Sequence, residues 1–168
     1  MIMDNGKMEI LAIQTLRNSV MAANFMATTA ILLIIGTLNL GEKIGHWAQY
    51  WHPALIANSV SAEIWHIKLA FLILNFAIAF YFFSMSIRFF NHVGYMIALI
   101  CDRSVDLELQ KQTRAYLNRA GSYYRYGTRA FFFSFPIIMW FFGSYFLIPA
   151  TLGLIVGLYL LDRVPVLD

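Results

Sequence analysis

Three long and strongly apolar stretches of the chain contain no charged residue: Val20–Leu40, Leu69–Ile87 and Ala130–Leu161. An α-helix rises about 1.5 Å per residue, so about 20 apolar residues cross the roughly 30 Å hydrocarbon core of a bilayer. The first two stretches have that length. Only 12% of the residues are charged, whereas soluble domains have about 25%. The sequence therefore predicts an all-α fold, a polytopic helical membrane protein with its first two spans at about 20–40 and 69–87.

The third stretch, Ala130–Leu161, is too long for one span. As a single helix it would extend about 48 Å and would need a tilt beyond the usual range of up to about 40°. Proline and glycine residues interrupt it, and the segment GSYFLIP (143–149) is the best candidate for a turn. We predict two short spans, about 130–145 and 147–161, which gives about four spans in one membrane domain, 1–168. A three-span arrangement stays open.

The positive charges are distributed unevenly between the two sides that these spans define. With four spans, both termini and the loop 88–129 share one side, which holds ten Lys and Arg residues against two on the other. Positive residues are enriched in cytoplasmic loops. We therefore expect a multi-pass protein of the inner (plasma) membrane with cytoplasmic N- and C-termini. The ten residues are Lys7, Arg17, Arg88, Arg103, Lys111, Arg114, Arg119, Arg125, Arg129 and Arg163, and the two are Lys43 and Lys68.

The cytoplasmic loop 88–129 is too apolar for a simple linker, and we predict that it is helical. Its first part, NHVGYMIALI, can continue the second span as one helix. Its later part has apolar and small residues at steps of four and three, which is typical of one helix face. Lys111, Arg114 and Arg125 share another face. This basic face can contact anionic lipid headgroups or a partner, or it can simply face water.

Polar side chains inside the first two spans are the main candidates for function. Asn24 and Thr28 are four residues apart and share one helix face, and Asn75 lies near the middle of the second span. An amide without a hydrogen-bond partner costs several kcal/mol in lipid. These side chains must therefore contact protein, water or a ligand. Hydrogen bonds between helices and a polar pathway are both compatible with the pattern.

Small residues mark two faces for close helix packing. One is a stripe along the first span and the other is a GxxxG pattern in the last span, and such residues let helix backbones approach each other. We expect the protein to be a homo-oligomer or a subunit of a membrane protein complex, with one of these faces at a contact. The stripe consists of Ser19, Ala23, Ala27 and Ala30, and the GxxxG pattern of Gly153 and Gly157.

The sequence contains no pattern that indicates catalysis or metal binding. A single cysteine, Cys101, excludes an intrachain disulfide and a CxxC site. Glu63 and His66 form one ExxH pair, but helical di-iron sites use two such pairs with two further glutamates. GxSxG and glycine-rich phosphate-binding motifs are absent. We therefore expect a protein that is not an enzyme, with no catalytic residue, metal, cofactor or nucleic-acid partner.

Two functions are compatible with these features. The first is a non-catalytic accessory or structural subunit of a larger membrane assembly, which the helix-packing faces and the lack of catalytic motifs favour. The alternative is an oligomeric channel or transporter module for a small solute or ion. In that case Asn24, Thr28 and Asn75 would line its polar path.

Three segments resemble the domain of unknown function 599 family of multi-spanning membrane proteins. They are LAIQTLRNSVMAANFMATTAILL, SIRFFNHVGYMI and YGTRAFFFSFPIIMWFFGSYFLIPAT. The resemblance covers residues 10–160 apart from the outer loop, and it implies several spans, a basic cytoplasmic loop and no established activity. Family members carry another span ahead of the QTLRN stretch, and this chain begins almost at that stretch. The span is absent, the start lies elsewhere, or another subunit takes its place.

Overall fold

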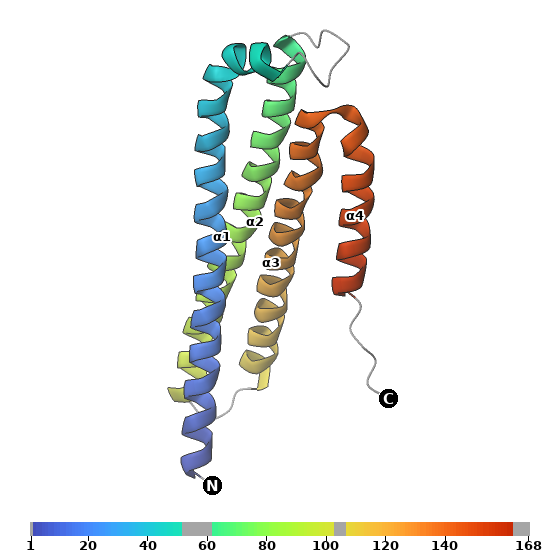
Figure 1. Cartoon of the computed structure of the whole chain (residues 1–168). Coiled ribbons are helices and arrows are strands. Elements are labelled where there is room, and N and C mark those ends of the chain that lie inside the picture. The colour runs from blue at the N-terminus through green and yellow to red at the C-terminus, as the bar shows by residue number, and fades with distance from the viewer. Residues whose placement is uncertain (1, 52–61, 103–106, 163–168) are drawn as a thin grey trace. The chain divides into compact units, whose positions relative to one another are not determined.

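The computed structural model describes the backbone of residues 2–51, 62–102 and 107–162, and the side chains of residues 10–43, 63–98 and 107–160. Within these ranges the chain is all-helical, as the sequence predicts (Figure 1). The four helices are α1 (Ile2–Trp51), α2 (Ala62–Asp102), α3 (Leu107–Phe142) and α4 (Ser144–Asp162).

The helices are longer than the spans predicted from the sequence. The expected spans 20–40 and 69–87 lie inside α1 and α2, and α2 continues through NHVGYMIALI to Asp102. The expected helical loop 88–129 is divided between two helices, and its later part forms one continuous helix with the third apolar stretch. The basic segment and the apolar segment of α3 therefore belong to one continuous helix.

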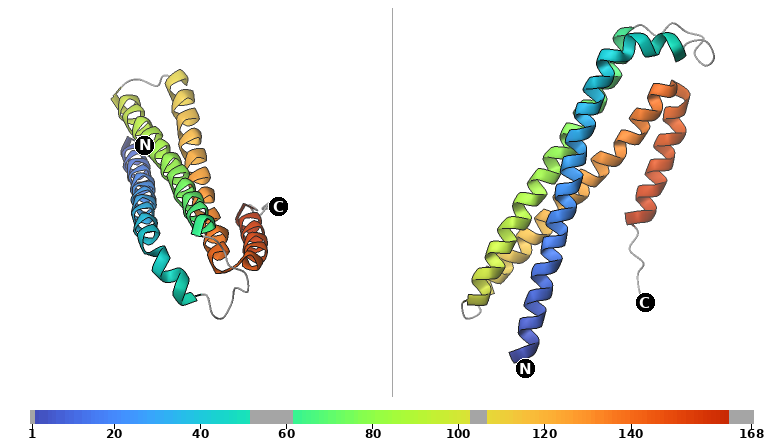
Figure 2. Two further views of the ribbon diagram at one scale, coloured as in Figure 1. Left: turned by 90° about the horizontal axis from the view of Figure 1, so that it is seen from above. Right: turned by 60° about the vertical axis from the view of Figure 1, so that its left-hand side comes forward.

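Gly143 separates α3 from α4, at the first residue of the segment predicted to turn. Its φ angle is 153°, a conformation that glycine adopts readily because it has no Cβ. The backbone N–H of Phe146 donates a hydrogen bond to the Gly143 carbonyl, at 3.1 Å. Pro136 and Pro149 lie inside α3 and α4 instead of ending them. In both views of Figure 2, α4 runs back beside the last part of α3.

The chain divides into two compact units, and α1, α2 and α3 contribute to both. The first unit comprises Met1–Thr29 and Phe80–Gly127, and the second comprises Ala30–Ala79 and Thr128–Asp168. In the first unit, the fully buried Phe83 and Val93 of α2 lie in the core with Ala23 of α1 and Ala120 of α3. The Ser86 hydroxyl donates a hydrogen bond to the Ala120 carbonyl, at 2.9 Å.

Aromatic rings join α2 to α3 throughout the first unit. The Phe89 and Tyr123 rings stack with their centroids 5.3 Å apart, and those of His92 and Tyr116 stack at 5.6 Å. Phe83 contacts Tyr124 edge-on at 5.7 Å. Such pairs contribute about 0.5–1.5 kcal/mol beyond the area they bury. The aromatic content of the two segments therefore fixes how α2 and α3 pair in this unit.

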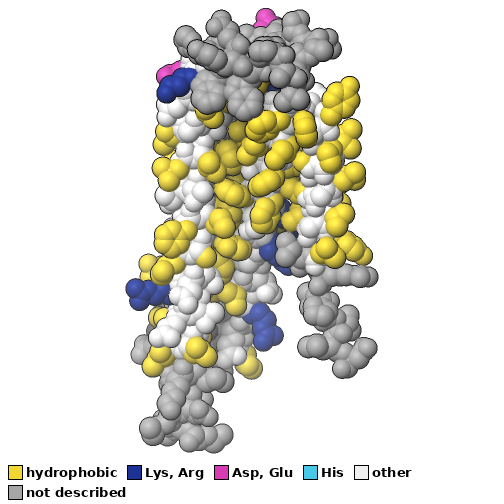
Figure 3. All heavy atoms as spheres, viewed as in Figure 1, with side chains coloured by type: hydrophobic (Ala, Val, Ile, Leu, Met, Phe, Trp, Pro, Cys, Tyr) yellow, Lys and Arg dark blue, Asp and Glu magenta, His cyan; other side chains and the backbone are white. Residues whose placement is uncertain are grey.

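In the second unit the core lies between α1, α2 and α3, while α4 stays largely exposed. Ala30, Phe76 and Ala79 are at most 2% exposed. By contrast, Leu152 and Leu160 of α4 are 59% and 64% exposed. The space-filling view shows hydrophobic side chains over the helices of this unit, α4 included (Figure 3). Apolar side chains therefore cover the outside of this unit as well as its interior.

In the part of the chain that the structure describes, two helices contain segments long and apolar enough to cross a membrane. These segments are Ile10–Lys43 of α1 and Glu63–Ala98 of α2, with mean hydropathies of 1.8 and 2.0. Their most apolar windows are only 22% and 28% buried. α4 contains a shorter apolar segment, Ser144–Leu160. Most of the apolar surface of α1 and α2 is therefore not covered by the chain itself.

Candidate functional site

Asn75 makes a hydrogen bond between two helices of the second unit. Its amide Nδ2 on α2 donates to the Ala130 carbonyl of α3 at 3.0 Å, and the side chain is half-buried. A carbonyl oxygen has two lone pairs, so Ala130 can accept this bond in addition to its helical one. The Asn75 amide donor is therefore used inside the chain.

Asn24 and Thr28, on α1 of the first unit, have a different environment. Both side chains are exposed. Among the residues that the structure describes, neither side chain has a hydrogen-bond partner. The neighbouring Thr29 is also exposed, but its hydroxyl donates to the Phe25 carbonyl at 2.8 Å. Asn24 and Thr28 therefore present free hydrogen-bonding groups on the outer face of an apolar helix.

The small-residue stripe of α1 is more buried than Asn24. Ala23 and Ala27 are 0% and 6% exposed, and Ser19 is half-buried. This stripe packs within the chain, so it is not an open contact face. Gly153 and Gly157 of α4 differ, because a Cβ atom added at either glycine would have no neighbour within 4 Å.

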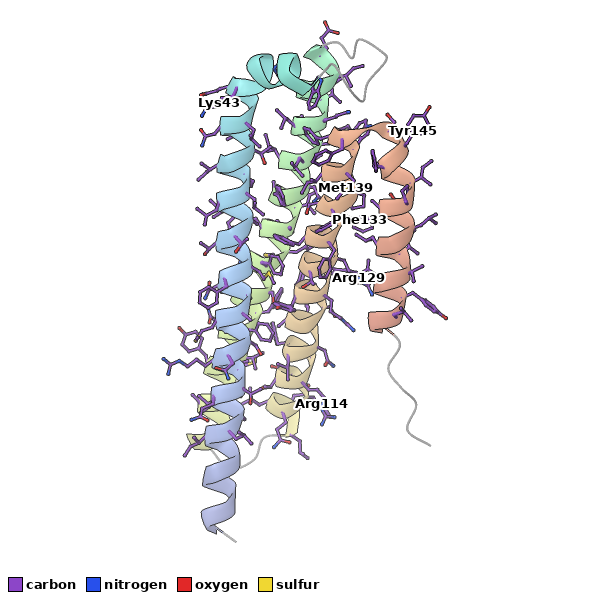
Figure 4. The ribbon with its side chains drawn as sticks, viewed as in Figure 1. Lys43, Arg114, Arg129, Phe133, Met139 and Tyr145 are labelled. Atoms are coloured by element: carbon purple, nitrogen blue, oxygen red, sulfur yellow. The ribbon has the colours of Figure 1, made fainter. Side chains whose placement is uncertain are left out.

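A basic surface covers α3 in the first unit. Lys111, Arg114 and Arg125 are all exposed, and Arg114 lies near the beginning of α3 in Figure 4. The Arg125 guanidinium donates to the Ser122 hydroxyl at 3.2 Å. Arg17, Arg88 and Arg119 are also exposed in this unit, where Glu108 is the only acidic residue with a described side chain. This surface therefore suits an anionic ligand.

Lys68 is the functional candidate that the sequence reasoning missed. It lies on α2 in the second unit and is only 6% exposed. Its Nζ donates to the Trp140 carbonyl at 2.9 Å and lies 5.0 Å from the Trp140 ring and 5.4 Å from the Trp65 ring. Trp140 is in the last turn of α3, where carbonyls lack helical partners. Lys68 therefore caps α3 while two indole rings stabilise its charge.

A signal for the Lys68 cluster exists in the sequence, but it is only local. Trp65 precedes Lys68 by three residues, which places both on one face of a helix. Nothing in the sequence indicates that Trp140 completes the cluster. The Trp65 indole Nε1 is buried and has no hydrogen-bond acceptor among the described residues.

Comparison with known families identifies the chain. The model of the family described as "Protein of unknown function, DUF599" matches residues 1–166. The chain belongs to the DUF599 family. This confirms the resemblance drawn from the three segments above. No curated protein and no solved structure matches the chain.

Exposed polar and basic side chains are the candidate functional features of this DUF599 protein. Among the described residues, no three His, Cys, Asp or Glu side chains lie close enough to hold a metal ion. Two further residues able to bind a metal, His46 and His52, have side chains outside the described part, as does Cys101. The features that point outward are the free polar pair Asn24 and Thr28 and the basic surface of α3. Both are suited to recognition.

Proposed function

We propose that this DUF599 protein is an integral membrane protein that serves as a non-catalytic subunit of a membrane protein assembly. The observation that carries the proposal is the exposed pair Asn24 and Thr28, which has no partner among the described residues. A polar group on the outside of a membrane helix is stabilised when a neighbouring helix supplies a hydrogen-bond partner. A subunit contact supplies such a helix.

The exposed apolar side chains support a location in the bilayer. On α1, Phe25 and Leu32 are 70% and 63% exposed, and on α2, Phe71 and Leu74 are 54% and 57% exposed. Burying apolar surface is favourable by about 25 cal/mol per Å², and soluble monomers rarely expose apolar patches larger than a few hundred Å². Lipid chains cover this surface in the arrangement that we propose.

We further propose that both termini and the basic surface of α3 are cytoplasmic and that the protein spans the inner membrane about four times. The charge distribution supports this orientation, because positive residues favour the cytoplasmic side. Lys111, Arg114 and Arg125 would then face the anionic headgroups of the inner leaflet, which attract exposed cations within about a Debye length.

The channel alternative has less support. It requires Asn75 to line a polar path, and the Asn75 amide instead donates to the Ala130 carbonyl. A donor that already has a partner inside the chain offers less to a passing solute. We therefore favour the subunit function.

Two measurements test this proposal. The first tests membrane location and topology. Membranes are extracted at alkaline pH to see whether the protein is released, and a reporter fused after Asp168 and a tag within 54–59 show on which side of the membrane each lies. The protein should stay in the membrane, with the reporter cytoplasmic and the tag external. Release by alkali would refute the membrane location, and an external reporter would refute the four-span topology. The second measurement is native mass spectrometry after gentle solubilisation, where a monomer without co-purifying chains would refute the subunit function.

A further inference from the structure

One line of exposed residues on α1 contains Asn24 and Thr28, whose side chains have no hydrogen-bond partner among the described residues. Its residues follow one another at alternating steps of four and three, the pattern by which two helices pack along a common line. All of them are exposed, and we call them the α1 seam: Ile10, Gln14, Arg17, Met21, Asn24 and Thr28. Along the same helix the spacing continues with Ile31, Ile35 and Leu38, which are 40%, 50% and 56% exposed.

We propose that the α1 seam docks against the α1 seam of a second copy of this chain, with the two helices parallel and Asn24 facing Asn24. This inference rests on the membrane location proposed above. It replaces the small-residue stripe as the contact face, because Ala23 and Ala27 are buried within the chain.

The polar residues of the α1 seam are better stabilised by contact with protein than by contact with lipid. Thr15 and Thr29 lie off the seam, and their hydroxyls donate to carbonyls four residues earlier, both at 2.8 Å. The Thr28 hydroxyl and the Asn24 amide have no such partner among the described residues. A purely lipid-facing seam would leave that amide unpaired in hydrocarbon.

A second copy satisfies Asn24 because an amide is both a donor and an acceptor. Across a two-fold axis, each Asn24 can donate to the other and accept from it, which is the self-complementarity that such an interface requires. The charge bias that orients one copy orients every copy in the same way. Two copies therefore place Asn24 at the same depth. A single polar residue in a helix-pairing seam also fixes the register of the pair.

Arg17 is the seam residue that opposes a parallel pair, because it meets a like charge. It lies three residues before the uncharged stretch begins, at the level of the headgroups. A long arginine side chain can bury its stem and turn its charged group toward lipid phosphates. Arg17→Gln should therefore leave the association unchanged or strengthen it.

Cysteine cross-linking in native membranes tests which face is used. The full chain carries Cys101→Ser, and single cysteines replace Met21 or Thr28 on the seam and Ala22 or Thr29 off it. All four positions are exposed, so differences in yield report on which face makes the contact. We expect mild oxidation to give a disulfide-linked dimer of twice the chain mass for the seam pair only. Equal yields at Thr28 and Thr29 would overturn the proposal.

A second measurement tests the role of the amide itself. Asn24→Leu should weaken self-association of the full chain in lipid vesicles, measured by energy transfer between labelled copies, by about 3- to 30-fold. Asn18→Leu, an exposed asparagine off the seam, is the matched control and should change it by less than about twofold. Equal losses in the two variants would overturn the proposal.

The outcomes separate this inference from the proposed function. A cysteine at residue 21 or 28 that cross-links only to a chain of different mass refutes the second copy and keeps the subunit function. Release of the protein from membranes by alkali refutes the membrane location and the dimer with it. The midpoint of thermal unfolding of Asn24→Leu in detergent should match that of the unmodified chain, because the residue is exposed. A large decrease in the midpoint would place Asn24 in an intramolecular contact and overturn the inference.

Discussion

Gly127 of α3 is a position where adding a single methyl group, as in Gly127→Ala, should clearly lower the free energy of unfolding. It is buried in the first unit, directly against the fully buried ring of Phe83. A Cβ atom at residue 127 would lie 2.9 Å from two ring carbons of Phe83 and 3.1 Å from a third. Carbon atoms pack at about 3.5–4.0 Å, so Gly127→Ala requires the ring or the helix to move by roughly 0.6 Å or more.

The magnitude follows from two opposing effects. Alanine stabilises a helix by about 0.8–1 kcal/mol relative to glycine, while overpacking a buried site costs about 1–3 kcal/mol. The Phe83 ring is 0% exposed and contacts Tyr124 edge-on, so it has little room to move. We therefore expect the upper part of that range and a net loss of about 1–2 kcal/mol in the free energy of unfolding.

The assay is reversible unfolding of the purified protein in detergent micelles, with helicity as the signal. Gly121→Ala is the matched control on the same helix, because a Cβ there has no neighbour within 4 Å, and it should stabilise the protein by up to about 1 kcal/mol. Phe83→Leu should destabilise the unmodified chain more than it destabilises Gly127→Ala, since the smaller side chain removes the clash. If Gly127→Ala and Gly121→Ala have equal stability, the close packing of Phe83 on Gly127 is refuted.

Three further predictions concern polar and charged residues. Lys68→Met should lower the free energy of unfolding by about 1–3 kcal/mol, because it leaves a carbonyl of α3 without a donor; the exposed Lys43→Met is the control, and equal effects would contradict the capping role. Asn75→Leu should cost about 0.6–1.7 kcal/mol against little change for the exposed Asn39→Leu, and an unchanged midpoint would show that the hydrogen bond to α3 contributes nothing. Replacing Lys111, Arg114 and Arg125 of α3 by glutamine should lower the affinity of the protein for anionic lipid by about fivefold for each charge removed. Native mass spectrometry in mixed micelles measures this affinity, and unchanged lipid binding would exclude the basic surface of α3 as the binding site.

The sequence by itself determined the helical class and the apolar character of the chain. Both are local properties, since the helix period and the uncharged stretches are visible in neighbouring residues. The turn at Gly143 could also be predicted, because a glycine inside an apolar run near prolines indicates a change of direction. The exact ends of the helices could not be predicted. A helix continues as long as its backbone hydrogen bonds are made, whether or not the segment is apolar.

Only the tertiary structure decided which polar residues are satisfied inside the chain. Asn24 and Asn75 look alike in the sequence, yet Asn75 donates to a carbonyl 55 residues away, whereas Asn24 is exposed and has no partner among the described residues. Lys68 likewise finds its acceptor 72 residues away, at the end of α3. Hydrogen bonds between helices depend on which faces pack together, and that choice follows from the whole set of contacts. The sequence around a residue therefore does not indicate which side chains and carbonyls of another helix will contact it.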